Sequence, residues 1–219
     1  MKAAFIPCLL FVFISSYSQQ LIKYSFDNDV SIQLPKNSVI TDTLGQKMIK
    51  GNIGGVNVIF LRTSEKDSTV TIENKSELIE FYSGFQKGYA QSVNGKIVSS
   101  KVIDKGHLKA SEFQCQSKIS TLNITIDGLV VFLNNYSYTI QFFNMGAEIE
   151  DYETQKKSIL ASLKFREGLS IDNQMTNAEE SSMGYKIGEV IGYFLGVAVL
   201  IILILMILKK NKDKRLPRA

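Results

Sequence analysis

The residue types that most often carry out chemistry in exported proteins are scarce in this chain of 219 residues. His107 is the only histidine, which excludes a site with two or more histidine ligands. A serine–histidine mechanism would depend on this residue alone. His107 follows Asp104, Lys105 and Gly106 at a predicted turn, where a solvated loop histidine is the simpler interpretation.

Cys115 is the one cysteine left once the predicted signal peptide, which contains Cys8, is removed. Cys115 alternates with Phe113 on a predicted strand, which favours a buried, unreactive thiol; an exposed thiol that pairs between chains is the alternative. Residues 51–55 are glycine-rich but lack the Gly-Lys-Ser/Thr ending of a phosphate-binding loop, so they predict a hairpin turn. We therefore assign no catalytic residue, no cofactor-binding residue and no metal ligand.

Both ends of the chain carry patterns that are typical of membrane targeting. Residues 1–18 open with Lys2, continue through an apolar run and end in small residues before Gln19, which predicts a cleaved secretory signal peptide. An uncleaved anchor is the alternative. Residues 187–208 predict one transmembrane helix, because residues 190–208 carry no charge and a helix of that length matches a hydrocarbon core of about 30 Å.

The basic residues after this run predict its orientation. They form a stop-transfer cluster in the predicted tail, residues 209–219: Lys209, Lys210, Lys212, Lys214 and Arg215. Because excess Lys and Arg stay in the cytoplasm, we expect a cytoplasmic tail and a periplasmic or extracellular domain at residues 19–166. Residues 19–186 carry 18 Lys and Arg against 19 Asp and Glu. A folded part without basic excess disfavours a nucleic-acid partner.

Alternation of apolar and polar residues predicts a sheet in the exported domain. Every second residue is apolar in residues 122–126 and 136–142, which is typical of half-buried strands. Residues 129–133 between them are apolar throughout and predict a strand that is covered on both faces. Further β-rich segments lie at residues 30–34, 48–52, 56–62, 96–104 and 108–119. Most connections are short, so the strands should pair antiparallel.

Two segments have helical spacing instead. Residues 77–93 place an apolar stripe on one side, with Asn74 or Ser76 available as the N-cap. Residues 148–163 begin with acidic residues and end with lysines, as the helix dipole favours. Each helix has a single apolar face that only the sheet can bury. We therefore predict an α+β domain, a mostly antiparallel sheet with packed helices.

Four features together resemble the PsbP-like family, extrinsic photosystem subunits and their bacterial periplasmic relatives. They are an opening strand that ends in Pro35, a central helix, strands that end in Tyr-Ser-Tyr-Thr-Ile-Gln-Phe at residues 136–142, and a closing helix with Ser-Leu-Lys-Phe at residues 162–165. The likeness covers residues 24–165. It implies the α+β fold of that family and an accessory role in binding or assembly on membrane complexes. Metal-contacting residues of the plant members have no matching position here.

Residues 167–186 are mostly polar and predict a linker between domain and membrane. From these features we expect a non-catalytic, single-pass membrane-anchored binding or assembly module. The alternative is an exported enzyme, such as a hydrolase built from Asp and Ser residues on one face of the sheet. Signalling across the membrane is a third class, which the short tail disfavours.

Glycines recur at intervals of four at the start of the predicted span: Gly184, Gly188, Gly192 and Gly196. Residues at this spacing share one helix face and form a shallow groove. In lipid, helices associate through close backbone contact, which small residues permit. We predict that the helix pairs through this groove with a second copy or with another membrane protein, chiefly through Gly192 and Gly196. Chance is the alternative, because glycine is common in membrane helices.

Overall fold

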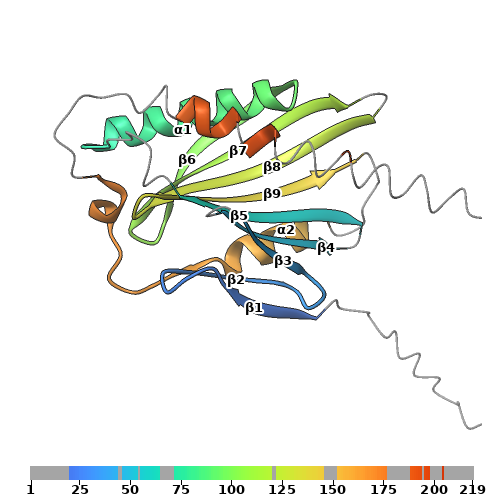
Figure 1. Ribbon diagram of the computed structural model, residues 1–219, viewed down its shortest axis with the longest axis horizontal. Helices are drawn as coiled ribbons and strands as arrows, with labels where there is room; N and C mark the ends of the chain where they lie inside the picture. Colours follow the sequence, from blue (N-terminus) through green and yellow to red (C-terminus); the bar gives the residue numbers. More distant parts are fainter. Residues whose placement is uncertain are drawn as a thin grey trace, which may run out of the picture.

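The computed structural model describes residues 20–43, 46–53, 55–64, 72–119, 122–145, 152–176, 188–193, 195–197 and 204. Seven strands form an antiparallel sheet in the order β3-β4-β5-β9-β8-β7-β6 (Figure 1). They are β3 (Val39–Thr43), β4 (Gln46–Ile53), β5 (Val56–Ser64), β6 (Gly95–Lys105), β7 (Leu108–Ile119), β8 (Leu122–Leu133) and β9 (Tyr136–Asn144). The two faces of this sheet carry separate hydrophobic cores.

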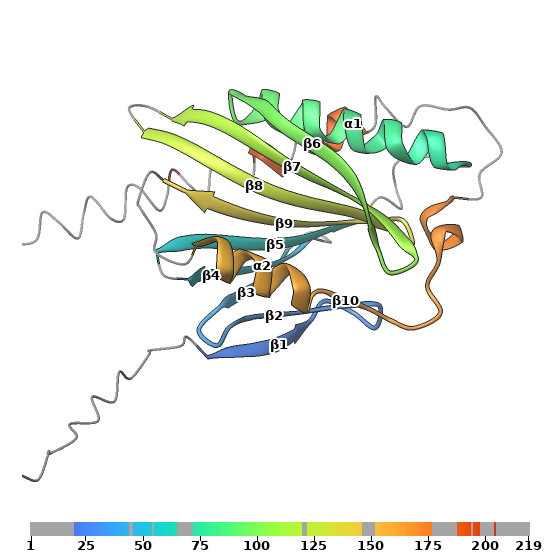
Figure 2. The same ribbon diagram turned by 180° about the vertical axis from the view of Figure 1, so that it is seen from behind.

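The remaining elements cover these two faces. Helix α1 (Lys75–Ser92) lies on one face. Helix α2 (Tyr152–Ser162) lies on the other, together with a small sheet of β1 (Leu21–Ser25), β2 (Val30–Pro35) and β10 (Lys164–Phe165), as Figure 2 shows from behind. A short 3-10 helix, η1 (Ile171–Gln174), follows β10. The predicted α+β fold with a mostly antiparallel sheet is therefore confirmed.

Local sequence explains the best-predicted elements. Strand β8 buries every second residue in its first half, and residues 129–133 are all buried, as the unbroken apolar run predicted. Helix α1 begins after Asn74, whose side-chain oxygen accepts hydrogen bonds from the backbone N–H groups of Ser76 (2.9 Å) and Glu77 (3.1 Å). These bonds satisfy donors that the first turn of a helix leaves without partners.

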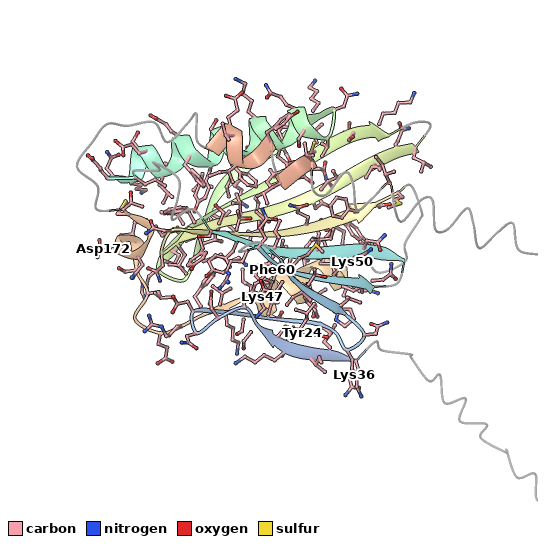
Figure 3. All side chains as sticks on the ribbon, viewed as in Figure 1. Tyr24, Lys36, Lys47, Lys50, Phe60 and Asp172 are labelled. Atoms are coloured by element: carbon pink, nitrogen blue, oxygen red, sulfur yellow. The ribbon has the colours of Figure 1, made fainter. Side chains whose placement is uncertain are left out.

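The β1–β2 hairpin packs on the large sheet through one aromatic contact and one lysine. The rings of Phe26 and Phe60 lie 4.0 Å apart between centroids. The Lys47 ammonium donates hydrogen bonds to the carbonyl groups of Ser25 (3.1 Å) and Phe26 (2.9 Å). In Figure 3, Lys47 and Phe60 lie on the side of the large sheet that faces this hairpin.

Asp27, in the turn of this hairpin, links it to two strands of the large sheet. Its carboxylate accepts hydrogen bonds from Arg62 on β5 (3.1 Å), from the Tyr138 hydroxyl on β9 and from the backbone N–H groups of Asp29 and Val30. Burial alone would raise the pKa of Asp27. The hydrogen bonds outweigh burial and hold this pKa below its ordinary value of 3.8.

Acid is therefore expected to loosen this hairpin. Folded Asp27 binds a proton less readily than unfolded Asp27, so its contribution to stability is complete above about pH 4 and is lost as the pH falls through the lowered pKa. The Asp27→Asn variant should show a flatter decline in unfolding free energy below about pH 4 in urea titrations. Asp42→Asn, at an exposed position, is the control and should keep the wild-type slope. Equal slopes for wild type and Asp27→Asn would contradict the assignment.

The start of the predicted linker is packed on the domain. Gln174 is fully buried, and its side-chain NH₂ donates to the carbonyl groups of Lys109 (2.8 Å) and Phe132 (2.7 Å) while its oxygen accepts from the Lys109 N–H (2.7 Å). Thr176 donates its backbone N–H to the carbonyl of Ile72 (2.8 Å), and the Ile72 N–H donates to the Thr176 hydroxyl. The prediction of a linker from residue 167 thus needs correction, because polar side chains here bond to strand backbone. Residues 177–187 lie outside the described part.

Residues 188–193 and 195–197 are helical and lie beside α1 (Figure 1). We call residues 188–197 the C-terminal segment; residue 194 within it is not described. Ile191 and Leu195 are buried in the same core as α1. Among the described residues, no helix combines the length and the apolar character that crossing a membrane requires. The predicted signal peptide, the rest of the predicted span apart from residue 204, and the basic tail lie outside the described residues.

Candidate functional site

Asp127 of β8 is the centre of a polar cluster between the large sheet and α2. Its carboxylate accepts hydrogen bonds from the Gln114 amide of β7 (2.9 Å) and from the Tyr152 hydroxyl of α2, and it pairs with the Lys156 ammonium (3.1 Å). Lys156 also pairs with Glu153 (2.8 Å). These groups satisfy one another, and they fasten a helix whose only fully buried residue among those described is Ile159.

Two groups of this cluster, Tyr152 and Lys156, have raised pKa values. Burial and the hydrogen bond to Asp127 both raise the pKa of Tyr152. Burial would lower the pKa of Lys156, but Glu153 and Asp127 outweigh it and raise that pKa. At neutral pH Tyr152 is therefore a neutral phenol and Lys156 an ammonium. Neither is prepared to act as a general base.

A groove of about 400 Å³ opens beside this cluster, between α2 and strands β6 to β8. Ser99, Lys101, Glu112 and Phe113 contribute to its lining. Among the described residues that line it there is no histidine and no cysteine, and charged residues of both signs are present. The groove offers polar contacts, which include the side chains of Ser99 and Ser100.

The two residues singled out for chemistry in the sequence lie apart from this groove. His107 is exposed at the β6–β7 turn, beside a small pocket of about 340 Å³ that Lys105, Lys164 and Arg166 also line. Cys115 is fully buried on β7, and burial raises the pKa of its thiol to about 11, so the prediction of a buried thiol is confirmed. Within the described ranges, no group of three or more His, Cys, Asp or Glu side chains is arranged to hold a metal ion.

The backbones of α1 and the C-terminal segment approach each other closely. On α1, three small buried residues recur every four positions, and we call them the glycine face of α1: Gly84, Gly88 and Ser92. A methyl group on Gly88 would overlap the carbonyl group of Glu189 and lie 2.8 Å from the backbone nitrogen of Tyr193. Only a residue without a side chain permits this approach.

The glycines of the C-terminal segment meet α1 in the same way. A methyl group on Gly188 would overlap the Phe81 carbonyl, and one on Gly192 would overlap the Phe85 carbonyl. One on Gly196 would overlap the Ser92 side chain. Each step of four residues along the segment matches a step of about four along α1, so the two helices run parallel and in register.

A pair of charges accompanies this register. The Lys87 ammonium lies 3.2 Å from the Glu189 carboxylate, and the two side chains are 48% and 27% exposed. A pair as exposed as this contributes little to stability. It does identify one alignment of the helices, because a shift of four residues would separate the charges by about 6 Å.

Three of the four glycines predicted to pack helices thus meet at one contact, and Gly184 lies outside the described residues. The basic residues predicted to set topology, Lys209, Lys210, Lys212, Lys214 and Arg215, lie outside them as well. Pairing with a second copy or another membrane protein stays a prediction. The sequence reasoning missed α1 as a partner, although its small residues show the same spacing.

No model of a known protein family matches the chain, and no curated protein matches it. The solution structure of cyanobacterial PsbP (CyanoP) from Synechocystis sp. PCC 6803 is similar, with a TM-score of 0.48 at 8% identity over 69% of this chain and 96% of that chain. The crystal structure of PA94 from Pseudomonas aeruginosa, a protein of unknown function, is similar with a TM-score of 0.42 at 9% identity, over 64% of this chain and 93% of that one. Membership of the PsbP-like family stays a prediction.

Proposed function

We propose that the chain is a non-catalytic, single-pass membrane-anchored module that binds or assembles with a helix of another membrane protein. Its domain would lie on the non-cytoplasmic side. The observation that supports this most directly is the backbone contact between the glycine face of α1 and a glycine-bearing helix. The uncharged run at residues 190–208 and the basic cluster after it support the anchor and its orientation.

Helix α1 has two sides that can pack. Leu78, Tyr82 and Tyr89 belong to the core on the sheet side. The glycine face has no large side chain of its own, so a second helix reaches the α1 backbone directly, and van der Waals contact together with burial of apolar side chains supplies the attraction. A partner that fits must itself carry small residues every four positions, with an acidic residue placed to meet Lys87.

The groove beside α2 is where an exported hydrolase-like enzyme would place its site. Asp127, Tyr152 and Lys156 bond to one another there, and the raised pKa values of the tyrosine and the lysine keep both protonated. These contacts support attachment of α2 rather than catalysis.

A leucine at position 88 is expected to remove binding. Gly88→Leu places a branched side chain on the glycine face, so a partner helix can no longer reach the α1 backbone. Proteins that co-purify with the wild-type chain from detergent-solubilised native membranes should be reduced at least tenfold with this variant. Quantitative mass spectrometry of the purified complexes measures the change.

Ser83→Leu is the matched control, because Ser83 lies on the exposed side of the same helix and its variant should keep the partners. Equal recovery with Gly88→Leu and Ser83→Leu would contradict the binding face. Orientation is checked separately with a reporter that is active only in the cytoplasm, which should work when fused after Ala219. An inactive reporter there would contradict the topology.

A further inference from the structure

The C-terminal segment overlaps the predicted transmembrane span. Residues 188–197 pack along α1, whereas residues 187–208 are the residues predicted to cross the bilayer. If residues 188–197 stay on α1, residues 198–208 remain to cross. As a helix they reach about 16 Å, which is little more than half of a hydrocarbon core of about 30 Å.

Helix α1 cannot follow the segment into the lipid. Glu80, Lys87 and Gln91 are exposed on α1, and its opposite side is packed on the large sheet. Charged side chains at the depth of the hydrocarbon core are costly. A docked segment therefore lies outside the lipid together with the domain.

We infer that the C-terminal segment has two mutually exclusive places, the glycine face of α1 and the bilayer. In the docked place it covers Gly88 and Ser92 and buries Ile191 and Leu195. In the spanning place it leaves the glycine face open. The helix-binding site of the proposed function, on which this inference rests, is then closed by the chain's own helix until that helix enters the membrane.

The contact between α1 and the C-terminal segment has features that allow the segment to move between α1 and the bilayer. Its glycines carry no side chains that must repack when the helices separate, and Ile191 and Leu195 are apolar and are accepted equally by lipid. Glu189 lies at the edge of the uncharged run, so it can leave Lys87 and stay at the lipid boundary. The residues of the C-terminal segment are therefore compatible both with packing on α1 and with insertion into the bilayer.

A zero-length carbodiimide cross-link between Lys87 and Glu189 reports the docked place, because their charged groups lie 3.2 Å apart. The full chain is synthesised in a cell-free system, with and without vesicles of phosphatidylcholine and one-fifth phosphatidylglycerol. Chains that resist alkaline extraction from the vesicles are the spanning population. Mass spectrometry should find the Lys87–Glu189 cross-link at least tenfold less often in them than in chains made without vesicles.

The cross-link between Lys156 and Asp127, which lie 3.1 Å apart within the domain, is the internal reference and should be equally frequent in both samples. The Lys87→Arg variant keeps the charge but loses the reactive amine. A cross-linked peptide that is absent from this variant is thereby identified as the Lys87–Glu189 product. Equal Lys87–Glu189 yields in the two samples would overturn the inference alone. A chain that never resists alkaline extraction would overturn the membrane anchor, and with it both proposals.

Discussion

Replacing Gly192 by leucine is expected to detach the C-terminal segment from α1. The new side chain would meet the carbonyl of Phe85 and the backbone nitrogen of Tyr89, and neither can move without breaking α1. Overpacking of this kind costs about 1–3 kcal/mol, and about 1.4 kcal/mol corresponds to a tenfold change in an equilibrium. The Lys87–Glu189 cross-link in chains made without vesicles should therefore fall about tenfold or more.

Val190→Leu is the matched control for this variant. Val190 lies in the same segment and is 53% exposed, so a larger side chain there meets solvent and the cross-link should keep its wild-type yield. Membrane insertion of Gly192→Leu should be unimpaired, because leucine favours the bilayer more than glycine does. A cross-link of undiminished yield in Gly192→Leu would contradict the close backbone contact.

Replacing Gln174 by leucine is expected to destabilise the domain by about 3–5 kcal/mol, a large part of an ordinary folding stability. Leucine fills a similar volume but makes no hydrogen bonds. The part-buried N–H of Lys109 and the buried carbonyl of Phe132 would lose their amide partner, and each unpaired group shielded from water costs about 1–3 kcal/mol. Urea unfolding, followed by circular dichroism, measures the shift in midpoint.

Gln91→Leu is the control for Gln174→Leu, because Gln91 is exposed on α1 and leucine is as good a helix former. Its midpoint should stay close to that of the wild type. A loss below about 1 kcal/mol for Gln174→Leu would mean that water replaces the amide, and that η1 is held less firmly than its hydrogen bonds suggest.

The elements predicted well from sequence are those whose signal is local. Alternation in residues 136–142 and the apolar run at residues 129–133 depend only on neighbours in the chain, and both are strands in the structure. The Asn74 cap is also local. Strands β1 and β3 were missed because they are short, and β10 is only two residues long and pairs with β2 far away in sequence.

The polar residues before residue 177 were misjudged for a different physical reason. A buried glutamine and a solvated glutamine look alike in sequence, because burial of Gln174 depends on backbone groups of β7 and β8 that only the fold brings to it. The glycines posed the converse problem. Their spacing predicted a helix contact, but no signal along residues 184–196 states which helix they meet.

The attachment of residues 174–176 also determines where mechanical load enters the domain. A pull on the C-terminal segment passes through Thr176, which is bonded to Ile72 just ahead of α1, and then to Gln174, which is bonded to β7 and β8. These bonds share the force between the start of α1 and strands β7 and β8 of the large sheet. Strand β10, held by two paired residues at the edge of the small sheet, is thereby shielded from tension applied to the C-terminal segment.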